Sequence, residues 1–197
     1  MLQRPIFMPA WDIGLLRCCT LLLLSSPSVD GNVGMTLIAI DGPAGAGKTT
    51  LAAKFERDLS LDNSVSVIHM DDLYAGWENA LDQHLTQKLK EIVEAFTSHS
   101  TFTISIFNWG SNSFDSIRTI EPTDILIIEG VGAGQKVVRD AGATLYWLDI
   151  EPSIGLARVL ARDGLDIELQ MRTWQIDQAS FFESDLTRNH ADHIITS

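Results

Sequence analysis

Short apolar runs alternate with segments of helical period along most of the chain. Runs such as 36–40 and 125–128 are almost continuously apolar, which is typical of strands buried on both faces of a sheet. The segments between them repeat apolar residues every three or four positions, as on one side of a helix. The pattern predicts strands over 36–40, 65–70, 101–107, 125–128, 144–150 and 194–196, and helices over 49–59, 78–98, 152–162 and 167–188. This alternation predicts an α/β fold whose mostly parallel sheet is covered by helices on both faces.

The two longest predicted helices have apolar sides that we expect to face the core. In the helix 78–98, apolar residues recur at steps of four or three: Leu81, Leu85, Leu89, Ile92 and Phe96. In the helix 167–188, the residues expected toward the core are Met171, Trp174, Phe181, Phe182 and Leu186. Pro152 is accepted in the first turn of the helix 152–162, and Asp163-Gly164 ends that helix.

Residues 1–34 do not follow this pattern. No helix or strand period is present, and prolines and glycines interrupt the segment: Pro5, Pro9, Gly14, Pro27, Gly31 and Gly34. We expect either an unstructured N-terminal extension or a start codon assigned too far upstream. In the second case Met35 is the true first residue. A short signal sequence and a partly ordered tail packed on the domain are the alternatives. Residues 35–197 are predicted to form one domain.

The composition excludes several kinds of partner. The 197 residues include 14 Lys and Arg against 26 Asp and Glu, which gives a formal net charge of −12. Such a chain lacks the basic face that sequence-independent nucleic-acid binding needs, and an anionic membrane surface would repel it. No apolar run reaches the roughly 20 residues that span a bilayer. The two cysteines, Cys18 and Cys19, are adjacent, which fits neither a disulfide framework nor a zinc site. We therefore expect no nucleic-acid partner and no membrane partner.

A glycine-rich loop carries the strongest chemical signal in the chain. The segment Gly42-Pro43-Ala44-Gly45-Ala46-Gly47-Lys48-Thr49 matches G-x-x-x-x-G-K-[ST] and lies between a predicted strand and a predicted helix. In such a loop, backbone N–H groups point at phosphate oxygens, Lys48 reaches the β- and γ-phosphates, and the Thr49 hydroxyl binds Mg²⁺. We therefore predict a three-layer P-loop NTPase fold that binds ATP and Mg²⁺ through these eight residues and Thr50.

The residues after later strands narrow the class of P-loop protein. The Asn-Lys-x-Asp motif of a GTPase is absent from the sequence, and Glu129-Gly130 stands where a motor or AAA-type ATPase normally has Asp-Glu. The strand 65–70 is followed by Asp71-Asp72, and a carboxylate at this place faces the γ-phosphate. It can accept a proton from an attacking hydroxyl group. Asp71 is the preferred base, with Asp72 as the alternative.

These features together resemble the uridine kinase and phosphoribulokinase group of P-loop kinases. The segments that carry the resemblance are the P-loop, Asp71-Asp72-Leu73-Tyr74, Glu129-Gly130 and Arg158-x-x-x-Arg162-Asp163, within about residues 35–163. The resemblance implies that Asp71 is the general base and that Glu129 helps to hold Mg²⁺ and water. Together with Thr49, these two carboxylates are the candidate metal ligands. It also implies that Arg162, with Arg158 beside it, clamps the transferring phosphoryl group. Arg172 is a weaker candidate for the same role.

The part of the family pattern that holds the nucleoside is different in this chain. Uridine kinases have Tyr-Asp there, followed by a His and an Arg that hold the nucleoside. This chain has Phe107-Asn108-Trp109-Gly110, without the His and with its next arginine at Arg118. Three aromatic residues are candidates to stack on a substrate ring, or else belong to the core: Tyr74, Trp77 and Trp109.

We therefore expect a cytoplasmic, ATP-dependent kinase that phosphorylates a hydroxyl of a small, nucleoside-like molecule. The loop with Asp41 before it also resembles that of cytidylate kinase, but an acceptor carrying a phosphate needs arginine clamps. Between Asp71 and Ile120 the basic residues other than histidine are Lys88, Lys90 and Arg118. A further alternative is a regulatory module that binds ATP and a protein partner. The sequence indicates neither the identity of the acceptor nor the oligomeric state.

Overall fold

Five parallel strands form the main sheet of the computed structural model, which describes residues 34–78 and 80–196. The strand order is β2-β5-β1-β6-β7. The strands are β1 (Thr36–Asp41), β2 (Val65–His69), β5 (Ile125–Glu129), β6 (Thr144–Asp149) and β7 (His193–Thr196). Parallel pairing confirms the fold class that the apolar runs predict. The extension predicted for residues 1–34 lies outside the described residues, apart from Gly34.

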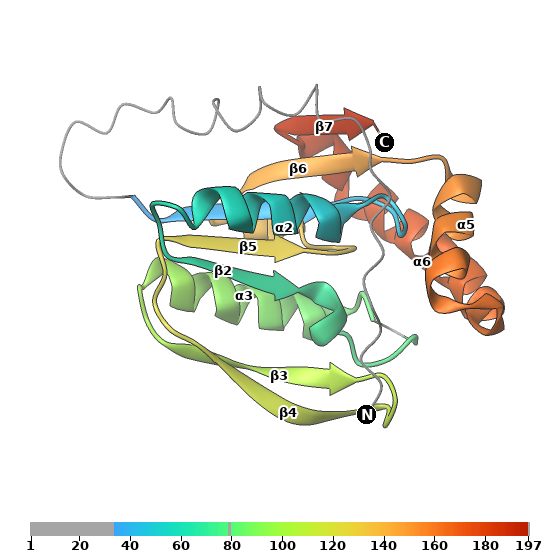
Figure 1. Ribbon diagram of the computed structural model, residues 1–197, viewed down its shortest axis with the longest axis horizontal. Helices are drawn as coiled ribbons and strands as arrows, with labels where there is room; N and C mark the ends of the chain where they lie inside the picture. Colours follow the sequence, from blue (N-terminus) through green and yellow to red (C-terminus); the bar gives the residue numbers. More distant parts are fainter. Residues whose placement is uncertain (1–33, 79, 197) are drawn as a thin grey trace. The chain divides into compact units, whose positions relative to one another are not determined.

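Successive side chains of the central strands point to opposite faces, and helices cover both faces (Figure 1). On one face, Phe55 of α2 (Lys48–Leu59) packs edge-on against Tyr146, with ring centroids 5.0 Å apart. On the other face, Leu37 and Ala39 share a core with α3 (Gln83–Thr97) and α6 (Glu168–Asp185). The structure therefore has the three layers expected of the fold.

The helix predicted over 78–98 begins later than the apolar pattern suggests. In the structure α3 starts at Gln83, and the Asp82 carboxylate accepts hydrogen bonds from the backbone N–H groups of His84 (2.8 Å) and Leu85 (3.1 Å). The side chain thereby satisfies donors that the first turn leaves without a helical partner. A capping aspartate, rather than the first residue of apolar period, thus sets the start of this helix.

Replacing Asp82 by alanine is expected to lower the free energy of unfolding by about 1 kcal/mol, the usual cost of losing an N-cap. Glu78→Ala is the matched control, because Glu78 precedes the helix and is exposed. Urea denaturation of both variants measures the difference. Equal effects of the two substitutions would show that Asp82 does not cap α3.

A separate antiparallel hairpin lies beside the main sheet. It consists of β3 (Phe102–Asn108) and β4 (Ser113–Ile120), which pair with each other and not with the five-stranded sheet. The strand predicted over 101–107 is therefore present, but its partner was not predicted. Most of the β4 side chains are exposed, so the strand has no continuous apolar run that would reveal it.

The remaining helices agree with the pattern in part. The helix α5 (Pro152–Asp163) ends at Gly164 as expected, and α4 (Lys136–Asp140) was not predicted. Short 3₁₀ turns flank the longer elements: η1 (Met70–Asp72), η2 (Leu165–Ile167) and η3 (Thr187–His190). Helix α6 ends at Asp185, so the prediction that Leu186 faces the core is wrong; this residue is half exposed with φ 54°. Met171 and Trp174 lie in the core as expected.

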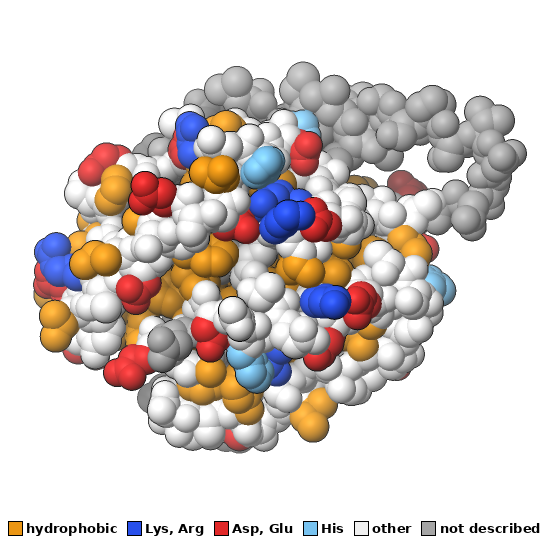
Figure 2. Space-filling view, turned by 180° about the vertical axis from the view of Figure 1, so that it is seen from behind, with side chains coloured by type: hydrophobic (Ala, Val, Ile, Leu, Met, Phe, Trp, Pro, Cys, Tyr) orange, Lys and Arg blue, Asp and Glu red, His pale blue; other side chains and the backbone are white. Residues whose placement is uncertain are grey.

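Among residues 34–78 and 80–196, none of the helices combines the length and apolar character needed to cross a bilayer. On the face shown in Figure 2, Lys and Arg side chains stand singly or in small groups beside acidic ones.

Candidate functional site

A cavity of about 650 Å³ opens where β1, β2 and β5 end. Figure 1 shows these strands pointing toward α5 and α6. Parallel strands end at a common edge of the sheet, and ligands of open α/β folds bind there. The cavity is large enough for a nucleotide and a small second molecule. Its lining contains most of the site residues predicted from the sequence: Ala44, Gly45, Gly47, Lys48, Thr49, Thr50, Asp71, Tyr74, Trp77, Trp109, Glu129, Arg158 and Arg162.

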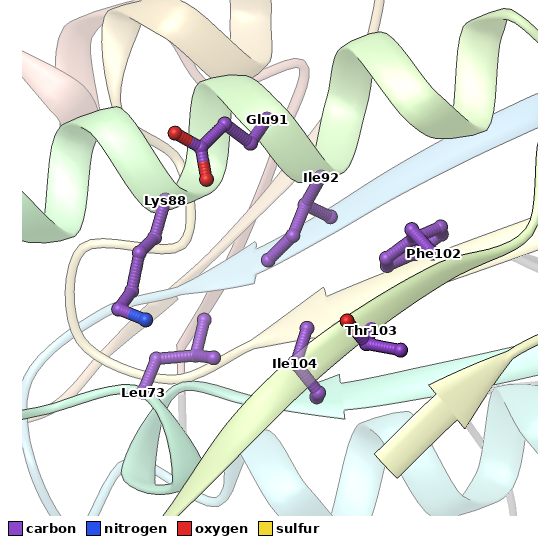
Figure 3. A pocket seen from close by; sticks show the side chains of 7 residues that line it. All are labelled: Leu73, Lys88, Glu91, Ile92, Phe102, Thr103 and Ile104. Atoms are coloured by element: carbon purple, nitrogen blue, oxygen red, sulfur yellow. The ribbon is translucent and has the colours of Figure 1, made fainter. Parts of the chain in front are cut away.

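Three predicted P-loop residues do not line this cavity. Gly42, Pro43 and Ala46 belong to the loop but are not among the residues that line the cavity. A second cavity, between α3 and β3, measures only about 60 Å³ (Figure 3). In Figure 3 the side chains of Ile92, Leu73 and Ile104 fill the space between helix and strand. This second cavity is too small for a substrate, so the candidate site is the larger one.

The glycine-rich loop is held against α5 by a contact between two glycines. A side chain carbon added at Gly45 would lie 2.3 Å from the carbonyl oxygen of Gly155, and one added at Gly155 would lie 2.5 Å from that of Ala44. Gly45 also has φ +81°, a conformation that other residues rarely adopt. Backbone therefore touches backbone here, which brings the arginine-bearing side of α5 close to the loop.

The Lys48 ammonium lies inside the loop. Its Nζ donates hydrogen bonds to the carbonyl oxygens of Gly42 and Pro43, both at 2.8 Å. Burial lowers the pKa of Lys48, and the carboxylates of Asp41 and Glu129 oppose this shift. The helix α2 begins at Lys48, and no side chain caps its N-terminus. An ammonium group beside uncapped helical N–H groups is a suitable environment for an oligophosphate.

Thr49, Glu129 and His69 form a hydrogen-bonded group at the floor of the cavity. The Thr49 hydroxyl donates to Glu129 Oε1 at 3.0 Å, and His69 Nδ1 lies 2.6 Å from the same oxygen. The Glu129 hydrogen bond is the main cause that raises the pKa of His69. The structure thus brings together two of the three predicted metal ligands. His69, at the end of β2, lies within hydrogen-bond distance of one of them.

Asp71 lies in the cavity, whereas the neighbouring Asp72 is not among the residues that line it. The enclosing protein raises the pKa of the Asp71 carboxyl, and the negative charge of Glu129 adds to the shift. Lys48 and Arg162 act in the opposite direction. The geometry therefore favours Asp71 over Asp72 as the residue that can act on a bound substrate; its catalytic role stays a prediction.

The two arginines of α5 line the cavity, and the arginine of α6 does not. Arg158 donates to the carbonyl oxygen of Gly45 at 3.3 Å. Arg162 forms two hydrogen bonds with Asp163, at 2.8 and 2.7 Å, and its charge also acts on Asp71 and Glu129. Arg172 pairs with Glu168, one turn earlier on α6. The structure therefore does not support the weaker suggestion that Arg172 reaches the site.

The three aromatic residues predicted to stack on a substrate differ in how far they are buried. Tyr74 is 2% exposed and its hydroxyl donates to the carbonyl oxygen of Val131 at 2.6 Å, so it is a core residue at the edge of the cavity lining. Trp109 is 39% exposed, and its indole N–H donates to the carbonyl oxygen of Asp71 at 3.0 Å. Trp77 lies between Trp109 and Trp174. Trp174 was predicted only as a core residue, but it also lines the cavity.

Asp41 is a buried carboxylate that our sequence analysis did not identify as functional. Its oxygens accept backbone N–H groups of Gly42 (2.7 Å), Gly132 (3.0 Å) and Gly134 (2.7 Å). These bonds tie the start of the P-loop to the segment that follows β5. Burial raises the pKa of Asp41 to about 6, while the same N–H groups and Lys48 oppose the shift. The sequence signal that could have identified Asp41 is an acidic residue directly after an apolar strand.

The raised pKa of Asp41 predicts a measurable dependence of stability on pH. Between the ordinary value of 3.8 and about 6, the folded state binds more protons than the unfolded state, so this residue's contribution to stability falls as pH rises. We expect the free energy of unfolding of the wild type, relative to Asp41→Asn, to decrease by roughly 2 kcal/mol from pH 4 to pH 7. Urea unfolding at both pH values measures this, since other groups cancel in the difference. If the difference in free energy of unfolding between the wild type and Asp41→Asn did not change with pH, it would contradict a raised pKa of Asp41.

Proteins with similar sequence or structure include several uridine kinases. The uridine kinase of Macrococcus caseolyticus is 29% identical over 164 residues, which cover 73% of this chain and 75% of that protein. The uridine kinase of Leuconostoc citreum is 24% identical over 144 residues, covering 64% and 68%. A possible uridine kinase from Bacillus stearothermophilus has a TM-score of 0.65 and 21% identity, over 90% of this chain and 95% of that chain. No protein-family model matches the chain.

These similarities confirm two sequence-based predictions. The chain has the fold of a P-loop kinase, and it resembles the uridine kinase group. They do not test the roles of individual residues.

Proposed function

We propose that this protein is an ATP-dependent kinase that transfers a phosphoryl group to a hydroxyl of a small, nucleoside-like molecule. The observation that carries the proposal is the convergence of Lys48, Thr49, Glu129 and Asp71 on one cavity, beside two arginines. Three strands deliver these side chains to a common edge of the sheet. The similarity to uridine kinases supports the same class of reaction.

In the proposed reaction each of these groups has a defined role. Asp71 accepts the proton of the acceptor hydroxyl, whose oxygen forms a bond to the γ-phosphorus of ATP. The bond from that phosphorus to the bridging oxygen of ADP breaks at the same time, and ADP leaves. Lys48 exchanges its hydrogen bonds to the two loop carbonyls for the β- and γ-phosphate oxygens. Arg162 and Arg158 neutralise charge on the transferring group.

The residues around Thr49 fit a magnesium ion. Mg²⁺ prefers oxygen ligands and usually keeps several waters while binding one or two protein groups and substrate phosphates. The Thr49 hydroxyl and the Glu129 carboxylate offer such oxygens, already 3.0 Å apart. No larger cluster of three or more His, Cys, Asp or Glu that could form a metal site of its own occurs in residues 34–78 and 80–196. When bound, Mg²⁺ would neutralise charge on the phosphates.

The test uses purified protein, MgATP and a panel of nucleosides, sugars and vitamin-like alcohols. ATP consumption is measured with and without each acceptor, and the phosphorylated product is identified by ³¹P NMR. A phosphate monoester formed from one acceptor class, with ADP in equal amount, is the expected result. ATP consumption that no acceptor changes would overturn the proposal in favour of a regulatory ATP-binding module. Transfer only to a nucleoside monophosphate would instead favour a cytidylate-type kinase.

A further inference from the structure

Part of the cavity lining is built from aromatic and apolar side chains. Its residues come from the turn after β3 (Trp109), the segment after η1 (Trp77), η2 (Ile167) and α6 (Met171 and Trp174). The ring of Trp77 packs edge-on against Trp109, with centroids 5.2 Å apart, and against Trp174 at 6.2 Å. Phe107 supports Trp109 from β3 at 5.2 Å. The tryptophans therefore form one continuous wall rather than three separate contacts.

The polar groups of this wall are already engaged with the protein. The Tyr74 hydroxyl donates to Val131, and the Trp109 indole N–H donates to Asp71. Asn108 uses its oxygen for the N–H groups of Gly110 and Ser111 and its amide for Asp115. These bonds close the turn of the hairpin. Asn108 is thus occupied at the place where uridine kinases carry the aspartate of their Tyr-Asp element.

The other polar side chains that line the cavity have roles in the proposed reaction or partners within the protein; Asp163, for example, accepts two hydrogen bonds from Arg162. Among the described residues they are the P-loop groups, the carboxylates Asp71, Glu129 and Asp163, and the arginines Arg158 and Arg162. The described lining contains no Asn, Gln, Ser or His side chain, and its Thr residues belong to the P-loop. Charges of both signs also disfavour a strongly charged acceptor. What the wall offers is apolar area and aromatic rings.

We infer, on the basis of the proposed function, that the acceptor is a neutral alcohol with a flat ring that stacks on the tryptophan wall. The polar atoms at the edge of this ring form no hydrogen bonds with side chains of the cavity. Stacking tolerates many rings because every base has a π face. A site that hydrogen-bonds its substrate rejects an analogue lacking the partner by about 10⁴- to 10⁵-fold, whereas apolar pockets discriminate only weakly. The site therefore accepts pyrimidine nucleosides and aryl alcohols of similar shape with comparable efficiency.

The experiment compares three acceptors with the same ribose: uridine, cytidine, and a C-nucleoside whose base is a phenyl ring. We expect kcat/KM values within roughly tenfold of one another. A preference of 10³-fold or more for one base would overturn the inference and leave the proposed function intact. Binding to the protein without ATP, followed by tryptophan fluorescence, gives a second readout. If none of the three binds, the inference is wrong even where another alcohol is phosphorylated. Equal binding without any phosphoryl transfer would support the wall and count against the kinase proposal.

Variants of the hairpin test the role of the wall directly. Trp109→Leu is expected to weaken binding of all three ribosides by roughly 5- to 100-fold, since stacking on one aromatic ring is lost. The KM for ATP should stay unchanged, and Trp109→Phe should restore most of the affinity because it keeps a ring. Phe114→Leu is the matched control, because Phe114 packs on Phe107 in the same hairpin but does not line the cavity. An effect of Phe114→Leu equal to that of Trp109→Leu would show that both act only through the stability of the hairpin.

Discussion

Lys48→Met is expected to lower turnover by roughly 10²- to 10³-fold, the usual effect of removing one charge-stabilising donor from a transition state. It should also weaken MgATP binding, because the ammonium is the one predicted contact to both the β- and γ-phosphates. Methionine keeps the length of the buried side chain, so the loop retains its packing. Steady-state kinetics and calorimetry with MgATP measure the two effects.

Lys54→Met is the control for Lys48→Met. Lys54 lies on the same helix and forms a salt bridge with Asp58, 3.1 Å long and four residues away. A surface pair of this kind contributes little, so activity should hardly change. Thermal unfolding of both variants checks that the fold is kept. Equal ATP affinity in the two variants would contradict the assignment of the P-loop.

Asp71→Asn should lower kcat by roughly 10²- to 10⁴-fold, the usual contribution of a general base. Asparagine keeps the shape of the side chain and removes the proton acceptor. Affinity for ATP should change little, since the loop, Lys48 and Thr49 remain. Asp72→Asn is the matched control, because Asp72 is adjacent in sequence but does not line the cavity. A larger loss from Asp72→Asn would mean that the neighbouring carboxylate is the base.

The pH dependence of the reaction offers an independent check on Asp71. Desolvation by the surrounding protein atoms and the charge of Glu129 raise the pKa of Asp71, and only the ionised carboxylate accepts a proton. Activity should therefore rise with pH through a value above the ordinary one of 3.8. This acid limb should disappear in Asp71→Asn. An unchanged acid limb in that variant would assign the titration to another group.

The features predicted best from the sequence are those that depend on neighbours along the chain. The buried strands follow from continuous apolar runs, and the loop from its glycines with Lys48 and Thr49. The meeting of Asp71 and Glu129 at one edge also follows, since parallel strands end together. These predictions need no knowledge of side-chain packing.

The features that were missed depend on contacts between distant segments. The strand β4 is mostly exposed, so its pairing rather than its pattern defines it. Asp41 acquires its importance from N–H groups more than 90 residues away. Trp174 looked like an ordinary core residue of a helix and becomes a wall of the cavity only when α6 packs beside Trp77. Leu186 follows the helical period, but the helix has already ended.

The separate pairing of the hairpin has a consequence for how such a protein can change during evolution. Because β3 and β4 form no ladder with the five-stranded sheet, substitutions there leave undisturbed the strand β1 that precedes the P-loop and the strand β5 that carries Glu129. The contact between Gly45 and Gly155, in contrast, leaves no room for a side chain on the ATP side. Substitutions at Trp109 and its neighbours can therefore change the acceptor during evolution, while the P-loop and its contact with α5 stay the same.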